Sequence, residues 1–178
     1  MKTTLILTLA LAGCADDTPM APVLFTPDFP GDDGEMDPDL QACAAAHLGL
    51  APEETISADD AATLKHLDCI DEGLSTINGI EAFGNLETLS LWENAIEDVS
   101  PLADLTGLKW LELGNNEITD ISALSALTGL ERFGASSNAI TDISVVTAFE
   151  QLEWLNLDDN TITDAEPIAS LSGLTWLT

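Results

Sequence analysis

Basic residues are scarce in this sequence of 178 residues. Four Lys and Arg stand against 32 Asp and Glu, so the formal net charge is −28 at pH 7. Such a chain repels nucleic acid and anionic lipid head groups, because both are densely negative. We therefore expect no nucleic-acid partner and no electrostatic binding to membranes, whereas a cationic partner would suit the charge.

The groups that most enzymes need are also scarce. Two histidines occur, His47 and His66, and no activated nucleophile, acid–base pair or phosphate-binding loop stands in a recognisable context. We expect no catalysis, no cofactor and no metal centre. Calcium takes about six to eight oxygen ligands, so a solvated acidic wall is the better interpretation of four aspartates that recur singly, Asp98, Asp120, Asp142 and Asp164.

No apolar run is long enough to span a bilayer. Residues 1–13 carry Lys2 and then a short apolar core, which predicts a secretion signal. The sequence LAGC that ends at Cys14 resembles a bacterial lipobox, which implies a lipid on Cys14; the alternative is an ordinary signal peptide with an incidental cysteine. By resemblance to bacterial sorting patterns, Ala15 implies the outer membrane or cell surface, with the lipid anchor as the only membrane contact.

Two further segments precede the main body of the chain. Residues 14–36 are rich in Pro, Gly and Asp, which predicts a disordered tether. Residues 37–63 predict a helical cap, because Asp37-Pro38 is a favourable helix start, Gly49 is a favourable end, and Ser57 begins a second capped segment.

The remainder is one 22-residue pattern written repeatedly. Four clear copies cover residues 86–107, 108–129, 130–151 and 152–173, a weaker copy covers 64–85, and a partial one covers 174–178. Positions 1, 4 and 6 of each copy are apolar, so positions 4 and 6 of a short strand face inward while 3, 5 and 7 face outward. A fixed period with L-x-x-L-x-L-x-x-N is the leucine-rich-repeat signature.

The second half of each copy also has a fixed pattern. Positions 11, 14, 17 and 20 are apolar but too close together for a full helix and return, and Pro101 and Pro167 lie among them. We therefore expect short 3₁₀ turns. Position 9 is expected to form a structural ladder of amides that bind turn backbone groups, through Asn94, Asn116, Asn138 and Asn160.

The phrase N-x-I-x-D-[IV]-S-x-L-x-x-L-T-x-L in these copies resembles the internalin-type leucine-rich repeats of bacterial surface proteins. The resemblance covers residues 37–178 and implies an α/β fold: a right-handed solenoid with a parallel β-sheet on its concave face, an irregular 3₁₀ convex face and an N-terminal helical cap. It also implies recognition or adhesion through the concave face, although fold and function separate readily.

Three cysteines occur in the chain. If Cys14 carries lipid, Cys43 and Cys69 remain as an even pair in an exported protein. Cys43 lies on the expected cap helix and Cys69 at an inward position of the first strand. A disulfide is the favoured interpretation, and two buried thiols or a metal pair are the alternatives.

All four tryptophans fall on outward strand positions. Because Trp and Arg are common at interface hot spots, we predict a binding face centred on Trp110, Arg132 and Trp154. The alternative is that Arg132 stacks between two indoles and only stabilises the sheet. The predicted partner-binding residues are Trp92, Trp110, Glu112, Arg132, Trp154, Asn156, Asp158 and Trp176.

The first expectation for this face is a protein partner, which the resemblance implies. A glycan is the second, because flat indoles beside polar side chains can stack sugars. A passive envelope scaffold without a specific ligand is the third. Glu112 and Asp158 can be drawn as a catalytic carboxylate pair, but an open concave sheet gives little of the enclosure that catalysis needs.

The repeat pattern is irregular in two places. In the third clear copy, Phe133, Gly134 and Ala135 replace the usual Leu-x-Leu; Phe133 is expected to compensate for the small Ala135, and Gly134 to leave a dip in the outward surface. Residues 174–178 begin a strand without the rest of a repeat. This predicts either a piece of a longer array or end-to-end association with another chain.

Overall fold

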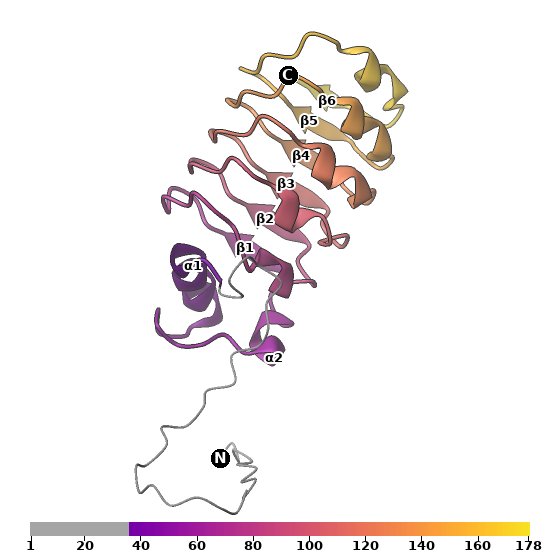
Figure 1. The fold of residues 1–178 in the computed structure, drawn as a ribbon. Helices are drawn as coiled ribbons and strands as arrows, with labels where there is room; N and C mark the ends of the chain where they lie inside the picture. Colours follow the sequence, from indigo (N-terminus) through magenta and orange to yellow (C-terminus); the bar gives the residue numbers. More distant parts are fainter. Residues whose placement is uncertain (1–35) are drawn as a thin grey trace, which may run out of the picture.

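A computed structural model describes residues 36–178 of the chain. The predicted signal peptide, the lipidation site Cys14 and nearly all of the predicted tether lie outside the described residues. Within residues 36–178, no helix combines the length and the apolar content that crossing a membrane requires. The described residues stack into an elongated solenoid, with helix α1 at one end and strand β6 at the other (Figure 1).

One wall of the solenoid is a six-stranded parallel sheet in the order β1 to β6. Each strand pairs in register with the residue one repeat later, as His66 does with Thr88 and Trp154 with Trp176. This register follows from the constant repeat length. The strands are β1 His66–Asp68, β2 Thr88–Ser90, β3 Trp110–Glu112, β4 Arg132–Gly134, β5 Trp154–Asn156 and β6 Trp176–Leu177.

The opposite wall consists of short 3₁₀ helices, as expected. They are η1 Ile80–Ala82, η2 Ser100–Leu102, η3 Ser122–Ala126, η4 Ser144–Ala148 and η5 Glu166–Ser170. The recurring aspartates begin these turns: Asp98 Oδ1 accepts from the Ser100 N–H at 2.8 Å, and Asp120 Oδ1 from the Ser122 N–H at 2.8 Å. The latter hydrogen bond holds the pKa of Asp120 below its usual range. These aspartates therefore have a structural role in addition to being solvated.

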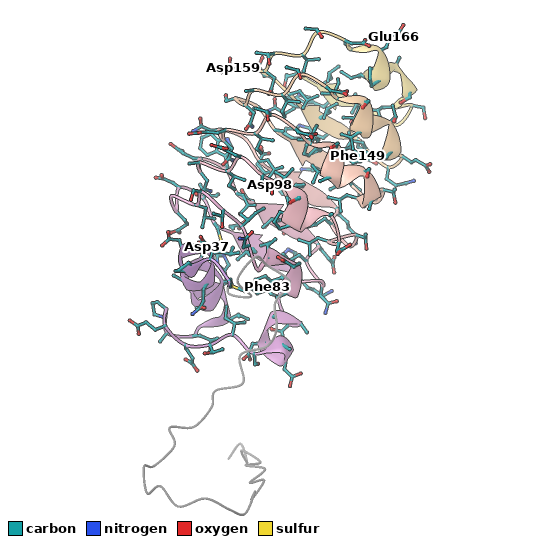
Figure 2. The ribbon with its side chains drawn as sticks, viewed as in Figure 1. Asp37, Phe83, Asp98, Phe149, Asp159 and Glu166 are labelled. Carbon is teal, nitrogen blue, oxygen red and sulfur yellow. A yellow bond between two sulfur atoms is a disulfide. The ribbon has the colours of Figure 1, made fainter. Side chains whose placement is uncertain are left out.

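The core lies between the two walls and runs the length of the array. Leu89 and Leu111 of the sheet and Leu102 and Leu124 of the 3₁₀ wall are all buried. Each repeat covers the apolar face of its neighbour, so stability comes from stacking. Phe83 and Phe149 lie within the molecule, whereas exposed carboxylates such as Asp98, Asp159 and Glu166 lie on its surface (Figure 2).

The irregular third copy is filled by aromatic rings. Phe133 is fully buried beside the buried Ala135. Its ring meets that of Phe149 edge to face, with 5.5 Å between the centroids. The expected volume compensation is therefore present, and two phenyl rings fill the space that paired leucines fill in the other three clear copies.

The asparagines at position 9 bind backbone on both sides of each turn. Asn116 Nδ2 donates to the carbonyls of Leu91 and Leu113, and its Oδ1 accepts from the Ile96 N–H. Asn94, Asn138 and Asn160 repeat this arrangement. Each amide thus joins its own repeat to the preceding one. The residue before it has a left-handed backbone, at Glu93, Asn115, Ser137 and Asp159.

The N-terminal cap is smaller than the sequence indicates. Helix α1, Pro38–Leu48, begins and ends as expected, with Asp37 accepting from backbone N–H groups and Gly49 at φ 71°. The second segment forms only one turn, α2 Ala58–Ala61, although Ser57 and Asp60 form a complete capping box. Ala61 is the single buried residue of α2, and a helix with so little apolar packing is only marginally stable.

Two connections hold α1 against the first strand. The favoured disulfide between Cys43 and Cys69 is present. His47 lies beside it: its Nδ1–H donates to the Cys43 carbonyl at 3.1 Å, and its Nε2 accepts from the Asp68 N–H at 3.4 Å. The cap therefore fixes the backbone of β1 at Asp68, whose carboxylate faces outward.

Candidate binding face

The outward side chains of the strands form a continuous surface, which we call the strand face. Its three exposed indoles are Trp92 (39% exposed), Trp110 (44%) and Trp176 (40%). Trp154 is half-buried, and no tryptophan belongs to the core. The strand face comprises His66, Thr88, Trp110, Arg132, Trp154 and Trp176 at position 3; Asp68, Ser90, Glu112, Gly134, Asn156 and Thr178 at position 5; and Ile70, Trp92, Gly114, Ser136 and Asp158 at position 7.

The aromatic stripe at position 3 divides into two pairs. The Arg132 guanidinium carbon lies 5.4 Å from the centre of the Trp110 ring. Trp154 stacks on Trp176, with 4.5 Å between centroids and 4° between planes. The hypothesis of an arginine between two indoles is therefore wrong: within residues 36–178 the guanidinium lies over the Trp110 ring alone, and Trp154 stacks on Trp176 instead.

Arg132 has no acidic partner within residues 36–178. The other two basic side chains of this part of the chain, Lys65 and Lys109, both form ion pairs with Glu87. Their hydrogen bonds, that of Lys65 first and that of Lys109 next, hold the pKa of the Glu87 carboxyl below its ordinary value of 4.5. Among residues 36–178, only the π face of Trp110 compensates the Arg132 charge, which leaves the guanidinium without a carboxylate partner there.

Glu112 lies in the middle of the strand face and is partly dehydrated. Its carboxylate occupies the space directly above Gly134, where an added Cβ would overlap it. Loss of hydration raises the pKa of the Glu112 carboxyl above 4.5, and a backbone hydrogen bond from Gly114 offsets part of the rise. The expected dip at Gly134 is therefore wrong, because the neighbouring carboxylate fills it.

A second glycine supports a second large side chain. The indole of Trp92 covers Gly114, so that an added Cβ would lie 2.6 Å from Trp92 Nε1. Gly114 and Gly134 are both buried although they occupy outward positions. In both contacts the glycine follows the large residue by one repeat, and this spacing is visible in the sequence. The alternation of inward and outward positions does not reveal the contacts by itself.

The N-terminal half of the strand face contains a shallow hollow that the sequence reasoning missed. Its volume is about 230 Å³, and its lining residues are His66, Asp68, Thr88, Leu89, Ser90 and Trp110. His66 Nδ1 and Thr88 Oγ1 lie 2.7 Å apart at its edge. Small residues beside the large Trp110 produce the depression. We call this feature the β1–β3 hollow.

The last two predicted residues lie towards the C-terminal end of the face. Asn156 Oδ1 accepts hydrogen bonds from the Asp158 N–H at 3.1 Å and the Thr178 hydroxyl at 3.0 Å. Asp158 is exposed. The predicted residues thus share one surface from β2 to β6. In the described part of the chain, no three His, Cys, Asp or Glu side chains are grouped so as to hold a metal ion.

Comparisons with known proteins agree with this architecture. The family model described as Leucine Rich repeats (2 copies) matches residues 84–125. No curated protein matches the sequence significantly. Among solved structures, an internalin (InlF) of Listeria monocytogenes is 34% identical with a TM-score of 0.76, over 78% of this chain and 42% of that one.

Two further structures extend the comparison. The functional domain of InlJ from Listeria monocytogenes is 25% identical, with a TM-score of 0.65 over 79% of this chain and 35% of that one. A leucine-rich-repeat protein of Leptospira interrogans is 25% identical, with a TM-score of 0.55 over 70% and 39%. The chain thus spans less than half the length of these three proteins. Fold, repeats and similarity together identify it as a leucine-rich-repeat protein with an internalin-like solenoid.

Proposed function

We propose that this chain is an exported recognition module whose strand face binds a protein partner. Its internalin-like fold supports a protein–protein interaction module. The observation that carries the proposal is the arrangement of Arg132 on Trp110 within a face that exposes three indoles. Exposed aromatic clusters mark interaction sites, and Trp and Arg are the residues most enriched at hot spots.

The rigidity of the face favours binding. Its side chains stand on a parallel sheet whose register is fixed from β1 to β6, and Trp154 and Trp176 are already stacked. Side chains ordered before association lose less conformational entropy on binding. The proposed contact residues are Trp92, Trp110, Glu112, Arg132, Trp154, Asn156, Asp158 and Trp176.

The charges on the strand face favour a basic partner that also supplies at least one carboxylate, for Arg132. Glu112 forms no ion pair within residues 36–178, and Arg132 has no carboxylate partner there. The net charge of −28 attracts cationic surfaces at a distance. A partner that supplies a carboxylate to Arg132 and cationic groups around it would complement both.

The place of action is part of the proposal. The predicted signal sequence of residues 1–13 and the lipobox-like LAGC at Cys14 support export and a lipid anchor at the outer membrane or cell surface. Mass spectrometry of the mature protein tests this: acyl chains on Cys14, absent from a Cys14→Ser variant, are expected. An unmodified Cys14 would contradict the anchor while leaving the binding face untouched.

A capture experiment tests the binding face. The Cys14→Ser chain is screened against arrays of cell-surface proteins and of glycans, beside Trp110→Ala/Arg132→Ala. Asp104→Ala/Gln151→Ala, two exposed positions away from the strand face, is the matched control. We expect a protein hit that weakens by about 30-fold or more in the first variant and is unchanged in the second. Equal binding by both variants would exclude this face, and a hit confined to glycans would exclude a protein partner.

A further inference from the structure

We infer that the β1–β3 hollow is a subsite for the ammonium group of a lysine side chain on the partner. This inference rests on the proposed function, because it names the group that one end of the strand face recognises. The hollow lies over β1, β2 and β3 and is bounded by Asp68, Ser90 and Trp110. Carboxylate, hydroxyl and indole face are the three kinds of group that an ammonium ion binds well.

Trp110 separates the hollow from the rest of the strand face. The strand order places β1 and β2 on one side of Trp110 and β4, which carries Arg132, on the other. Arg132 lies over the Trp110 ring from the β4 side, whereas the lining residues of the hollow come from β1 and β2. The indole can therefore receive a second cation from the β2 side without displacing Arg132.

Asp68 supplies a negative charge that nothing in residues 36–178 neutralises. Its carboxylate makes no ion pair or hydrogen bond in this part of the chain. Its backbone is fixed, because its N–H donates to His47 Nε2 and the next residue, Cys69, is in the disulfide to Cys43. An exposed, unpaired carboxylate on rigid backbone needs little reorganisation to bind a cation.

The three Lys and Arg side chains of residues 36–178 do not compete for Asp68. Lys65 and Lys109 are held by Glu87, and Arg132 lies beyond Trp110. A Lys or Arg side chain in the hollow must therefore come from outside residues 36–178, and the proposal assigns it to the partner. With a net charge of −28, the chain favours a basic partner over an acidic or neutral one.

The size of the hollow favours a single side chain. Its volume of about 230 Å³ is below the range of about 300–1,000 Å³ that is typical of small-molecule and cofactor sites. A lysine offers three ammonium donors, for which the Asp68 carboxylate and the Ser90 and Thr88 hydroxyls are acceptors. Its alkyl stem can lie against the Trp110 ring.

An NMR titration of the full Cys14→Ser chain tests the subsite. The probes are Nα-acetyl-lysine amide, the neutral Nα-acetyl-norleucine amide, and methyl β-glucoside. We expect the lysine probe to shift the Trp110 indole N–H and the Ser90 amide, and the norleucine probe to leave them unchanged. Raising the salt concentration should weaken the lysine effect, because the Asp68 contact is exposed to solvent.

Substitutions test whether Asp68 and Trp110 bind the lysine probe. Asp68→Asn should weaken the lysine probe by about three- to fivefold, as expected for an exposed ion pair. Trp110→Leu keeps an apolar wall but removes the π face, and should also weaken the probe. Asp104→Asn makes the same charge change away from the strand face and should leave it unaltered.

Several outcomes would overturn the subsite. Norleucine binding as well as lysine, Asp68→Asn without effect, or shifts from the glucoside alone would each do so, as would no shift from any probe. These results are separable from the capture experiment. A protein captured through Trp110 and Arg132 with no lysine effect overturns only the subsite. Lysine binding without any captured protein overturns the proposed function, and with it the assignment to a protein partner, but not the affinity of the hollow for an ammonium group.

Discussion

The Glu112 carboxylate lies directly above Gly134 of the next strand, in the space that a Cβ would occupy. Glu112 stands on β3 and Gly134 on β4, and the two are register partners in the sheet. The absence of a side chain at Gly134 lets the carboxylate lie against the sheet, where it loses hydration. The small size of Gly134 thus contributes to the raised pKa of the Glu112 carboxyl, in the centre of the proposed binding face.

Gly134→Ala is expected to release Glu112 from this position. The three atoms nearest to the new methyl group all belong to the end of the flexible Glu112 side chain, so we expect the carboxylate to move into solvent and the fold to be retained. The pKa of the Glu112 carboxyl should then fall back towards 4.5. A ¹³C NMR titration of the Glu112 carboxyl measures the change. An unaltered titration in the variant would show that Gly134 does not control this group.

Glu112→Gln is expected to stabilise the protein at neutral pH. Because the folded-state pKa of Glu112 is raised above 4.5, the folded protein binds the proton more tightly than the unfolded chain does. The contribution to stability is fully present below 4.5 and is lost as pH rises through the folded pKa. The neutral amide avoids this loss, so its advantage should be present at pH 7 and small below 4.5.

Urea denaturation at pH 7 and well below pH 4.5 measures this difference. Glu117→Gln, at an exposed position outside the strand face, is the control for loss of one negative charge. If both variants change stability equally at each pH, general charge repulsion is responsible, and burial of Glu112 is not.

Removal of the disulfide should destabilise the cap more than the array. Cys43 and Cys69 are separated by 26 residues, and opening a loop of this size costs about 3 kcal/mol of unfolding free energy. We expect Cys43→Ala/Cys69→Ala to lose about this amount in urea denaturation and to increase amide exchange in α1. Unchanged exchange in α1 would mean that packing and the His47 hydrogen bonds suffice to hold the helix on β1.

Glu93→Gly should stabilise the array. Glu93 has a left-handed backbone at φ 61°, which costs a residue with a Cβ about 1 kcal/mol or more, and glycine removes that cost. After allowance for the greater freedom of glycine in the unfolded chain, we expect a gain of roughly 0.5–1 kcal/mol. Glu97→Gly, at an exposed position outside the left-handed set, should lower stability in the same denaturation assay.

The arrangement of the backbone could be predicted because the same 22-residue pattern recurs in every repeat. The constant period places Leu89, Leu111 and Leu155 on the inward side of register-paired strands, and this is where they lie. The proximity of the apolar positions in each return segment excluded long helices, and the 3₁₀ turns follow. Disulfide pairing was predictable because Cys43 and Cys69 were expected at the same junction of cap and sheet.

The outward face was predictable in composition but not in contacts. Alternation showed that Trp110, Trp154 and Arg132 share a stripe, yet it did not show which indole the guanidinium contacts. Alternation also did not show that Lys65 and Lys109 both pair with Glu87. These ion pairs leave Arg132 as the one Lys or Arg side chain of residues 36–178 without a carboxylate partner. Side-chain direction on a solvated surface depends on the volumes of all neighbours, and a periodic pattern contains no information about them.

The sequence by itself determined the repeat, its inward residues and the surface on which all four tryptophans lie, and it favoured the disulfide that the structure shows. These follow from spacing along the chain, because stacked repeats of equal length convert sequence period into spatial register. Only the tertiary structure decided that Glu112 covers Gly134, that Trp92 covers Gly114, and that a hollow opens between Asp68 and Trp110. These depend on contacts across neighbouring strands, where a small residue leaves room for a large side chain of the adjacent strand to pack against the sheet.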